Sequence, residues 1–240
     1  QPFVSAHDFD GSEAWSLWGF DAEQASAHGS DSRGVALTIG RDGKLYFAGE
    51  AHGGETVFRQ DPRNVTRPLE TLVAQDAYAQ TSNLEGAAPM SFVSRHDLRS
   101  GVIERATFLL TRRESDGRGN AARPSALAVN EHGDVLLGGN AACCIEDGAK
   151  KTVMGQEAMP GYAGGAFFVL LDGDTFERRL WTAAHGGAEA QLKSVDIWGG
   201  AAVVVHEHVT AQGESSLEGS MVLHESFFAQ PQGGGSDIHI

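Results

Sequence analysis

The hexad at residues 3–8, Phe-Val-Ser-Ala-His-Asp, returns 89 residues later as Phe-Val-Ser-Arg-His-Asp at positions 92–97. A second, unlike segment recurs at an interval of 90: an apolar strand, a turn with Gly and another strand, at residues 35–49 and again at 126–139. Two unlike segments that repeat at nearly one period indicate a tandem array of similar modules.

Two kinds of hairpin alternate along the chain. The first kind is predicted at residues 3–8 with 14–20, 91–97 with 102–110 and 166–171 with 176–183, followed by a partial copy at 220–228. The second kind is predicted at residues 35–39 with 44–48, 125–129 with 134–137 and 192–198 with 201–206. Their turns contain Asp42-Gly43, His132-Gly133 and Gly199-Gly200, which favour tight reversals. Residues 22–33, 111–123 and 145–165 are expected to be loops, and one short helix is expected at 67–79 within the connection 52–89.

The repeated pattern resembles the bacterial β-propeller repeats of the SBBP type. The residues that carry the resemblance are 126–139 (Ala-Leu-Ala-Val-Asn-Glu-His-Gly-Asp-Val-Leu-Leu-Gly-Gly), 166–172 (Ala-Phe-Phe-Val-Leu-Leu-Asp) and 180–187 (Leu-Trp-Thr-Ala-Ala-His-Gly-Gly). The resemblance implies a propeller found in secreted or surface proteins, usually without assigned catalysis. It carries over no functional residues.

We therefore predict an all-β fold: a β-propeller, or a partial propeller of about three and a half blades, over residues 1–230, with a flexible tail at 231–240. Propellers close with about four to eight blades, so a second chain completes the ring, further strands remain uncounted, or the sheets close as a sandwich. The chain begins almost within a strand pattern without an initiator Met, which suggests a processed or excised piece of a precursor. With the resemblance, this predicts an extracytoplasmic location: periplasm, cell surface or secreted.

The net charge of −14 makes nucleic acid and anionic lipid improbable partners. Such an acidic surface suits a cation or a basic protein partner, although solubility alone would explain it. No apolar run approaches the ~20 residues that a membrane-spanning helix needs.

His206 and His208 form the most metal-like local feature, because residues i and i+2 of a strand share a face and could bind one zinc ion. A third ligand would have to come from His7, His96 or His224 on equivalent strands. The simpler reading is an edge strand made polar against aggregation.

Two further local features could bind a metal or a ligand. Asp8, Asp10 and Glu13 resemble part of a calcium loop, as does Asp172-Gly173-Asp174, but both lie where the repeat requires a hairpin turn. Adjacent Cys143 and Cys144 are either a strained vicinal disulfide or two buried thiols.

We find no nucleophile elbow, zinc-protease helix, phosphate-binding loop, dinucleotide fingerprint or haem attachment motif. The sequence therefore favours a non-catalytic binding or scaffolding module in an exported or surface assembly, acting through loops of one propeller face on a protein partner or a glycan. One alternative is a polysaccharide hydrolase that uses acids near the blade starts, Asp8, Asp97 and Asp172. Another is a subunit that holds a metal or cofactor through His206 and His208. The pairs His7-Asp8, His96-Asp97 and His224-Glu225 could line a channel mouth, but Asp is also a common turn starter.

Overall fold

The computed structural model describes residues 2–28, 31–52, 55–58, 60–69, 89–109, 111–112, 119–142, 152–153, 156–157, 164–183, 190–198, 201–209 and 215–223. Within these residues the chain consists mainly of strands in small antiparallel sheets. Two short helices are present there, α1 (Ala22–His28) and α2 (Glu55–Phe58). Neither has the length and apolar character needed to span a bilayer.

Four sheets, which we number I to IV, follow one another in chain order. Sheet I pairs β1 (Val4–His7) with β2 (Glu13–Leu17). Sheet II has the order β3 (Ser32–Ile39), β4 (Leu45–Ala51), β7 (Met90–His96) and β8 (Ile103–Leu109). Sheet III has the order β11 (Ala122–Val129), β12 (Val135–Ala141), β15 (Gly165–Leu171) and β16 (Arg178–Ala183). Sheet IV has the order β17 (Ala190–Trp198), β18 (Ala201–Val209) and β19 (Ser215–Leu223).

Three short strand pairs lie outside these sheets. They are β5 (Gln60–Asp61) with β6 (Asn64–Pro68), β9 (Thr111–Arg112) with β10 (Gly119–Asn120), and β13 (Thr152–Val153) with β14 (Gln156–Glu157).

The six complete hairpins predicted from the repeats are all confirmed, and the partial copy at 220–228 begins within β19. Four expectations were wrong in part. The loop expected at 145–165 contains β13, β14 and the first residue of β15. The loop expected at 22–33 contains α1, whose first turn is capped reciprocally: Gln24 N donates to Asp21 Oδ1 at 2.8 Å, and Asp21 N donates to Gln24 Oε1 at 3.1 Å. Arg67 and Pro68, where a helix was expected, belong to β6, and residues 70–79 lie outside the described residues. The loop expected at 111–123 contains β9 and β10 and the first residues of β11.

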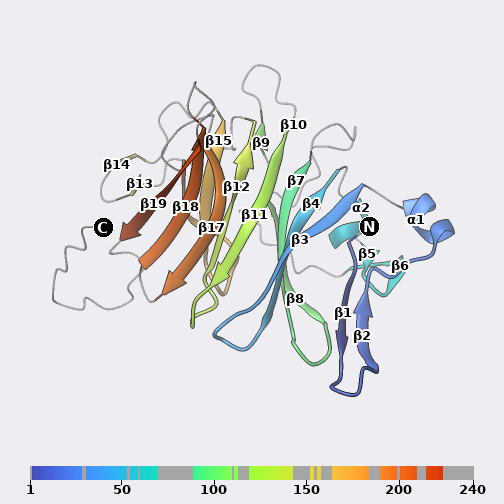
Figure 1. Cartoon of the computed structure of the whole chain (residues 1–240). Helices are drawn as coiled ribbons and strands as arrows, with labels where there is room; N and C mark the ends of the chain where they lie inside the picture. Colours follow the sequence, from blue (N-terminus) through green and yellow to red (C-terminus); the bar gives the residue numbers. More distant parts are fainter. Residues whose placement is uncertain are drawn as a thin grey trace.

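The sheets stack face to face through three apolar clusters. One cluster joins sheet I and α2 to sheet II, the second joins sheet II to sheet III, and the third joins sheet III to sheet IV. Figure 1 shows this succession, from sheet I at the right to sheet IV at the left. Sheet III is buried on both faces, which explains why β15 is apolar without alternation.

Each sheet from II to IV begins with a strand of the same design. The pairing register of β3, β11 and β17 shifts between Gly34 and Ala36, between Pro124 and Ala126, and between Leu192 and Ser194. A bulge at one place in three strands gives a common frame for comparing the sheets. In that frame β11 packs on β3 and β4, and β17 packs on β11 and β12.

The hairpin turns 8–12, 40–44, 97–102, 130–134 and 172–177 lie at one end of the stack, which we call the hairpin end. The opposite end, where β4 and β12 finish and β11 and β17 begin, is called the connection end. Figure 1 places the hairpin end at the bottom. The stack remains open among the described residues, since no sheet there closes on itself. The structure thus establishes stacked antiparallel sheets, and the propeller remains a prediction.

Candidate functional site

A hollow of about 440 Å³ opens at the connection end between sheets III and IV. Its lining residues are Arg123, Pro124, Ser125, Asn140, Gln191, Leu192 and Lys193. Except for Asn140, which belongs to β12, these residues lie at and beside the bulges near the start of β11 and β17. The bulges re-aim side chains at a strand end, a frequent use of such irregularities.

Hydrogen bonds between the two sheets hold the floor of this hollow. Ser125 Oγ donates to the Leu192 carbonyl at 2.9 Å, and the Leu192 N–H donates to Asn140 Oδ1 at 3.1 Å. Because both backbone groups of Leu192 are bound by side chains of sheet III, strand β17 is fixed at the rim. A preorganised wall of this kind lowers the entropy cost of binding a ligand.

Cationic side chains dominate the exposed part of the rim. Arg123 and Lys193 have 52% and 42% of their side-chain surface exposed. Lys193 Nζ lies 2.6 Å from Glu207 Oε2, and Arg123 Nη1 lies 3.3 Å from Glu50 Oε1. Each cation retains further N–H donors beyond these contacts.

Glu50 is the buried centre of an adjoining ion cluster between sheets II and III. Its Oε1 also lies 2.7 Å from Arg33 Nε, so one carboxylate serves two arginines. Its Oε2 is buried and has no hydrogen-bond partner among the residues that the structure describes. Counting both groups, three cations (Arg33, Arg123 and Lys193) face two carboxylates (Glu50 and Glu207). Among these five side chains the cations are in excess, in a chain whose net charge is −14.

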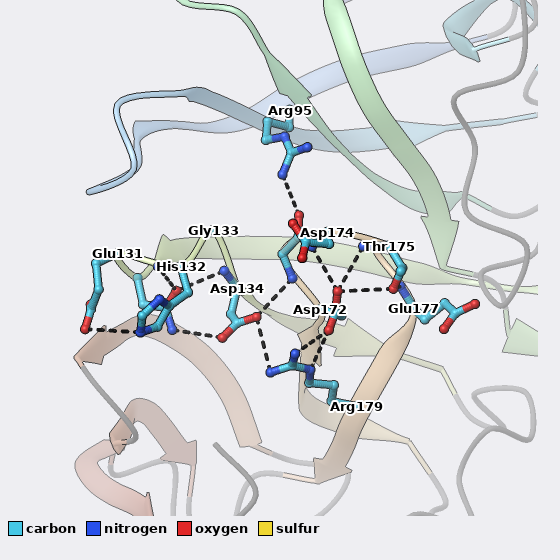
Figure 2. Close-up of polar contacts among 12 residues, drawn as sticks. Arg95, Glu131, His132, Gly133, Asp134, Asp172, Asp174, Thr175, Glu177 and Arg179 are labelled. Atoms are coloured by element: carbon cyan, nitrogen blue, oxygen red, sulfur yellow. Dashed lines mark hydrogen bonds and ion pairs between the residues drawn. The ribbon is translucent and has the colours of Figure 1, made fainter. Parts of the chain in front are cut away.

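The hairpin end carries a denser polar network, drawn in Figure 2, that ties turns 130–134 and 172–177 together. Asp134 is buried and accepts a hydrogen bond from the Gly173 N–H at 2.9 Å. Arg179 Nη1 lies 3.4 Å from Asp134 Oδ1, and Arg179 Nε donates to Asp172 Oδ2 at 2.8 Å. Arg95 of sheet II donates to the Gly173 carbonyl, which links sheets II and III. The network uses its acceptors within the protein, so we assign it to the fold.

Two of the three carboxylates suggested for hydrolysis, Asp97 and Asp172, accept hydrogen bonds within their own turns. Asp97 Oδ1 accepts from the N–H and the hydroxyl of Ser100 at 2.9 and 2.8 Å, and these hydrogen bonds lower the pKa of Asp97. Asp172 Oδ1 accepts from the N–H groups of Asp174 and Thr175, each at 2.9 Å. Burial alone would raise the pKa of Asp172, but these bonds and Arg179 outweigh it and lower the pKa. Asp8 is exposed at the turn between β1 and β2. Turn initiation accounts for these acids.

The histidines before these acids bind a serine rather than the acid. Ser94 Oγ and His96 Nε2 are 2.7 Å apart, and His96 Nδ1 is 3.1 Å from the Gly101 carbonyl. Ser5 and His7 repeat the pair at 3.1 Å on the exposed hairpin of sheet I. Burial lowers the pKa of His96 to about 4. His224 lies outside the described residues.

Two of the predicted calcium residues, Asp10 and Glu13, accept hydrogen bonds within the β1–β2 hairpin. Asp10 Oδ1 accepts from the Ser12 N–H and hydroxyl at 2.9 and 2.7 Å, and Glu13 Oε1 accepts from the Ser16 hydroxyl at 2.8 Å. Among the residues that the structure describes, no three His, Cys, Asp or Glu side chains are grouped to hold a metal. The calcium site stays a prediction.

His206 and His208 lie in β18, near its connection end. β18 is the middle strand of sheet IV, so the reading of these residues as an edge strand was wrong. The proposed third ligands His7 and His96 lie at the hairpin end of sheets I and II, so the fold does not bring them to β18. Since the remaining candidate ligand His224 lies outside the described residues, the zinc hypothesis stays a prediction; Cys143 and Cys144 also lie outside them.

Comparison with protein-family models gives no match, and comparison with curated proteins gives none either. The hollow was missed by sequence reasoning because its residues share no motif. No sequence signal could have located it, because its position depends on bulges in β11 and β17 that only the strand register reveals.

Proposed function

We propose that this chain is a non-catalytic binding module that recognises an anionic group, such as the carboxylate of an acidic glycan or peptide, in the hollow beside Arg123 and Lys193. The observation that carries the proposal is the combination of a preformed hollow and exposed cations at its rim. Arginine presents a planar set of donors that matches a carboxylate, and lysine adds a point charge.

The charge distribution indicates that the rim cations attract an anion only at short range and do not steer it from a distance. The net charge of −14 repels an anion at a distance, whereas the rim attracts it only within about a Debye length, ~8 Å at physiological salt. The expected affinity is therefore modest and falls as salt is added. A basic partner, expected from the overall charge, would bind elsewhere on the acidic surface.

The scaffold in this proposal is a set of propeller blades, made from sheets I to IV. The tandem order and face-to-face packing of the four sheets, and the bulge that sheets II to IV share, support the blade interpretation. Completion of the ring by a second chain, and an extracytoplasmic location, are further parts of the same proposal. No specific contact favours the hydrolase or cofactor-holding alternatives.

The test is calorimetric titration of the chain with a polygalacturonate oligosaccharide and with its neutral methyl ester. The proposal predicts salt-sensitive binding of the acid form alone. Arg123→Glu and the milder Lys193→Gln should weaken it at least tenfold, and the matched control Arg99→Glu, in an exposed turn at the hairpin end, should leave it unchanged. Equal binding of acid and ester, or equal loss with Arg99→Glu, would contradict the site.

A further inference from the structure

Equivalent apolar residues are buried in sheets III and IV but exposed in sheet II. The position three residues beyond the bulge is Ile39 in β3, Val129 in β11 and Ile197 in β17. Val129 is 7% exposed and Ile197 is 1% exposed, whereas Ile39 is 60% exposed. At the position one residue beyond the bulge, Leu37 is 55% exposed, Leu127 of sheet III is partly buried and Val195 of sheet IV is 8% exposed.

The burial of the counterparts has one cause in both cases. Val129 packs in the cluster that contains Tyr46 and Ala48, on the second strand of the preceding sheet. Ile197 packs in the cluster that contains Ala128 and Leu136, on the first two strands of the preceding sheet. In both clusters the first hairpin of the preceding sheet supplies part of the cover.

Sheet I lacks that hairpin in the part of the chain that the structure describes. The hexad repeat makes β1 the counterpart of β7, the third strand of sheet II. β7 pairs with β4 on one edge and β8 on the other, and β15 likewise pairs with β12 and β16. β1 pairs with β2 alone among the described strands. Among the described strands, β1 therefore has an unpaired edge, and β3 carries an exposed apolar row at Leu37 and Ile39.

We propose that a two-stranded β-hairpin from a partner polypeptide docks on Leu37 and Ile39 and pairs with β1, which completes sheet I as a four-stranded sheet. By analogy with the observed covers, the hairpin has small residues on its first strand and a large apolar residue early in its second. Strand addition supplies backbone hydrogen bonds, and the apolar row supplies specificity.

A second copy of this chain does not fit as the partner. Its candidate hairpins are β3–β4, β11–β12 and β17–β18. The outer edges of β4, β12 and β18 are already paired with β7, β15 and β19. None of these three described hairpins could pair with β1 without losing a neighbour, so a second copy could not supply any of them.

The test uses the full chain and a head-to-tail cyclised, fluorescent peptide with the sequence of residues 122–141, because this hairpin covers Ile197 in sheet IV. Cyclisation is needed because a free two-stranded hairpin is marginally stable in water. The proposal predicts saturable binding and slower amide hydrogen exchange in β1. Leu37→Lys/Ile39→Lys should weaken binding more than tenfold. Val102→Lys, an exposed apolar position in the β7–β8 turn, should leave it within twofold.

Three outcomes would overturn the proposal. They are no saturable binding, equal binding by the Leu37→Lys/Ile39→Lys variant, and loss of binding with Val203→Lys, which would place the peptide on the outer face of sheet IV. Circular dichroism checks that each variant is folded. These outcomes are independent of the anionic hollow, which lies at the other end of the stack between sheets III and IV.

Discussion

His96 accepts a hydrogen bond from Ser94 through Nε2, at 2.7 Å, inside the cluster between sheets I and II. The carbonyl of Gly101 can only accept, so His96 Nδ1 carries the proton of the neutral imidazole. The edge of Trp18 lies against the same ring, with centroids 6.1 Å apart. The counterparts of Ser94 and His96 in sheet III are Val169 and Leu171, so the polar pair replaces an apolar one.

This pair makes folding stability depend on pH. Burial lowers the pKa of His96 from 6.5 to about 4, so the unfolded chain binds the proton more readily than the folded chain. Stability is therefore highest above pH 6.5 and falls as the pH drops towards 4, by about 2 kcal/mol between pH 7 and pH 5. Urea denaturation at both pH values measures this change.

The control is the double variant Ser94→Val/His96→Leu, which copies the sheet III residues. This variant should lose the fall in stability between pH 7 and pH 5 that His96 causes. An unchanged difference between pH 7 and pH 5 in this variant would rule out His96 as its source.

The Asp134 carboxylate should be needed for the stability of the hairpin end. Asp134→Ala leaves the buried Gly173 N–H without its acceptor and should lower the free energy of unfolding by about 2 kcal/mol. Asp174 is exposed in the turn that contains Gly173, and Asp174→Ala should change the free energy of unfolding by less than about 0.5 kcal/mol. Similar losses in the two variants would show that the network of Figure 2 does not stabilise the fold.

The Glu50 carboxylate should contribute through its two arginines at the connection end. Glu50→Gln weakens charge-assisted contacts to Arg33 and Arg123 and should cost about 1–2 kcal/mol at low salt. The matched change Glu23→Gln, exposed on α1, should have almost no effect. A loss for Glu50→Gln no larger than that for Glu23→Gln would contradict this role.

The strands could be predicted from the sequence because two signals coincide in them. The recurring hexad located β1 and β7, and the Gly-containing turns located β3–β4 and β11–β12. The bulges could not be predicted, because the bulged residues Val35, Ser125 and Lys193 share no side-chain property. The hollow depends on those bulges and on contacts between sheets, so it could not be predicted from the sequence either. α1 could have been found from its Asp21–Gln24 capping pair.

The central claim is that sheets I to IV are successive copies of one unit, each covering the next. It is tested most directly by comparing Ile39→Ala with Ile197→Ala, the same change at equivalent positions, by urea denaturation. The account predicts a loss of about 2–4 kcal/mol for Ile197→Ala, which opens a cavity between sheets III and IV, and less than about 1 kcal/mol for the exposed Ile39→Ala. Equal losses at the two positions, or a larger loss at Ile39, would contradict it.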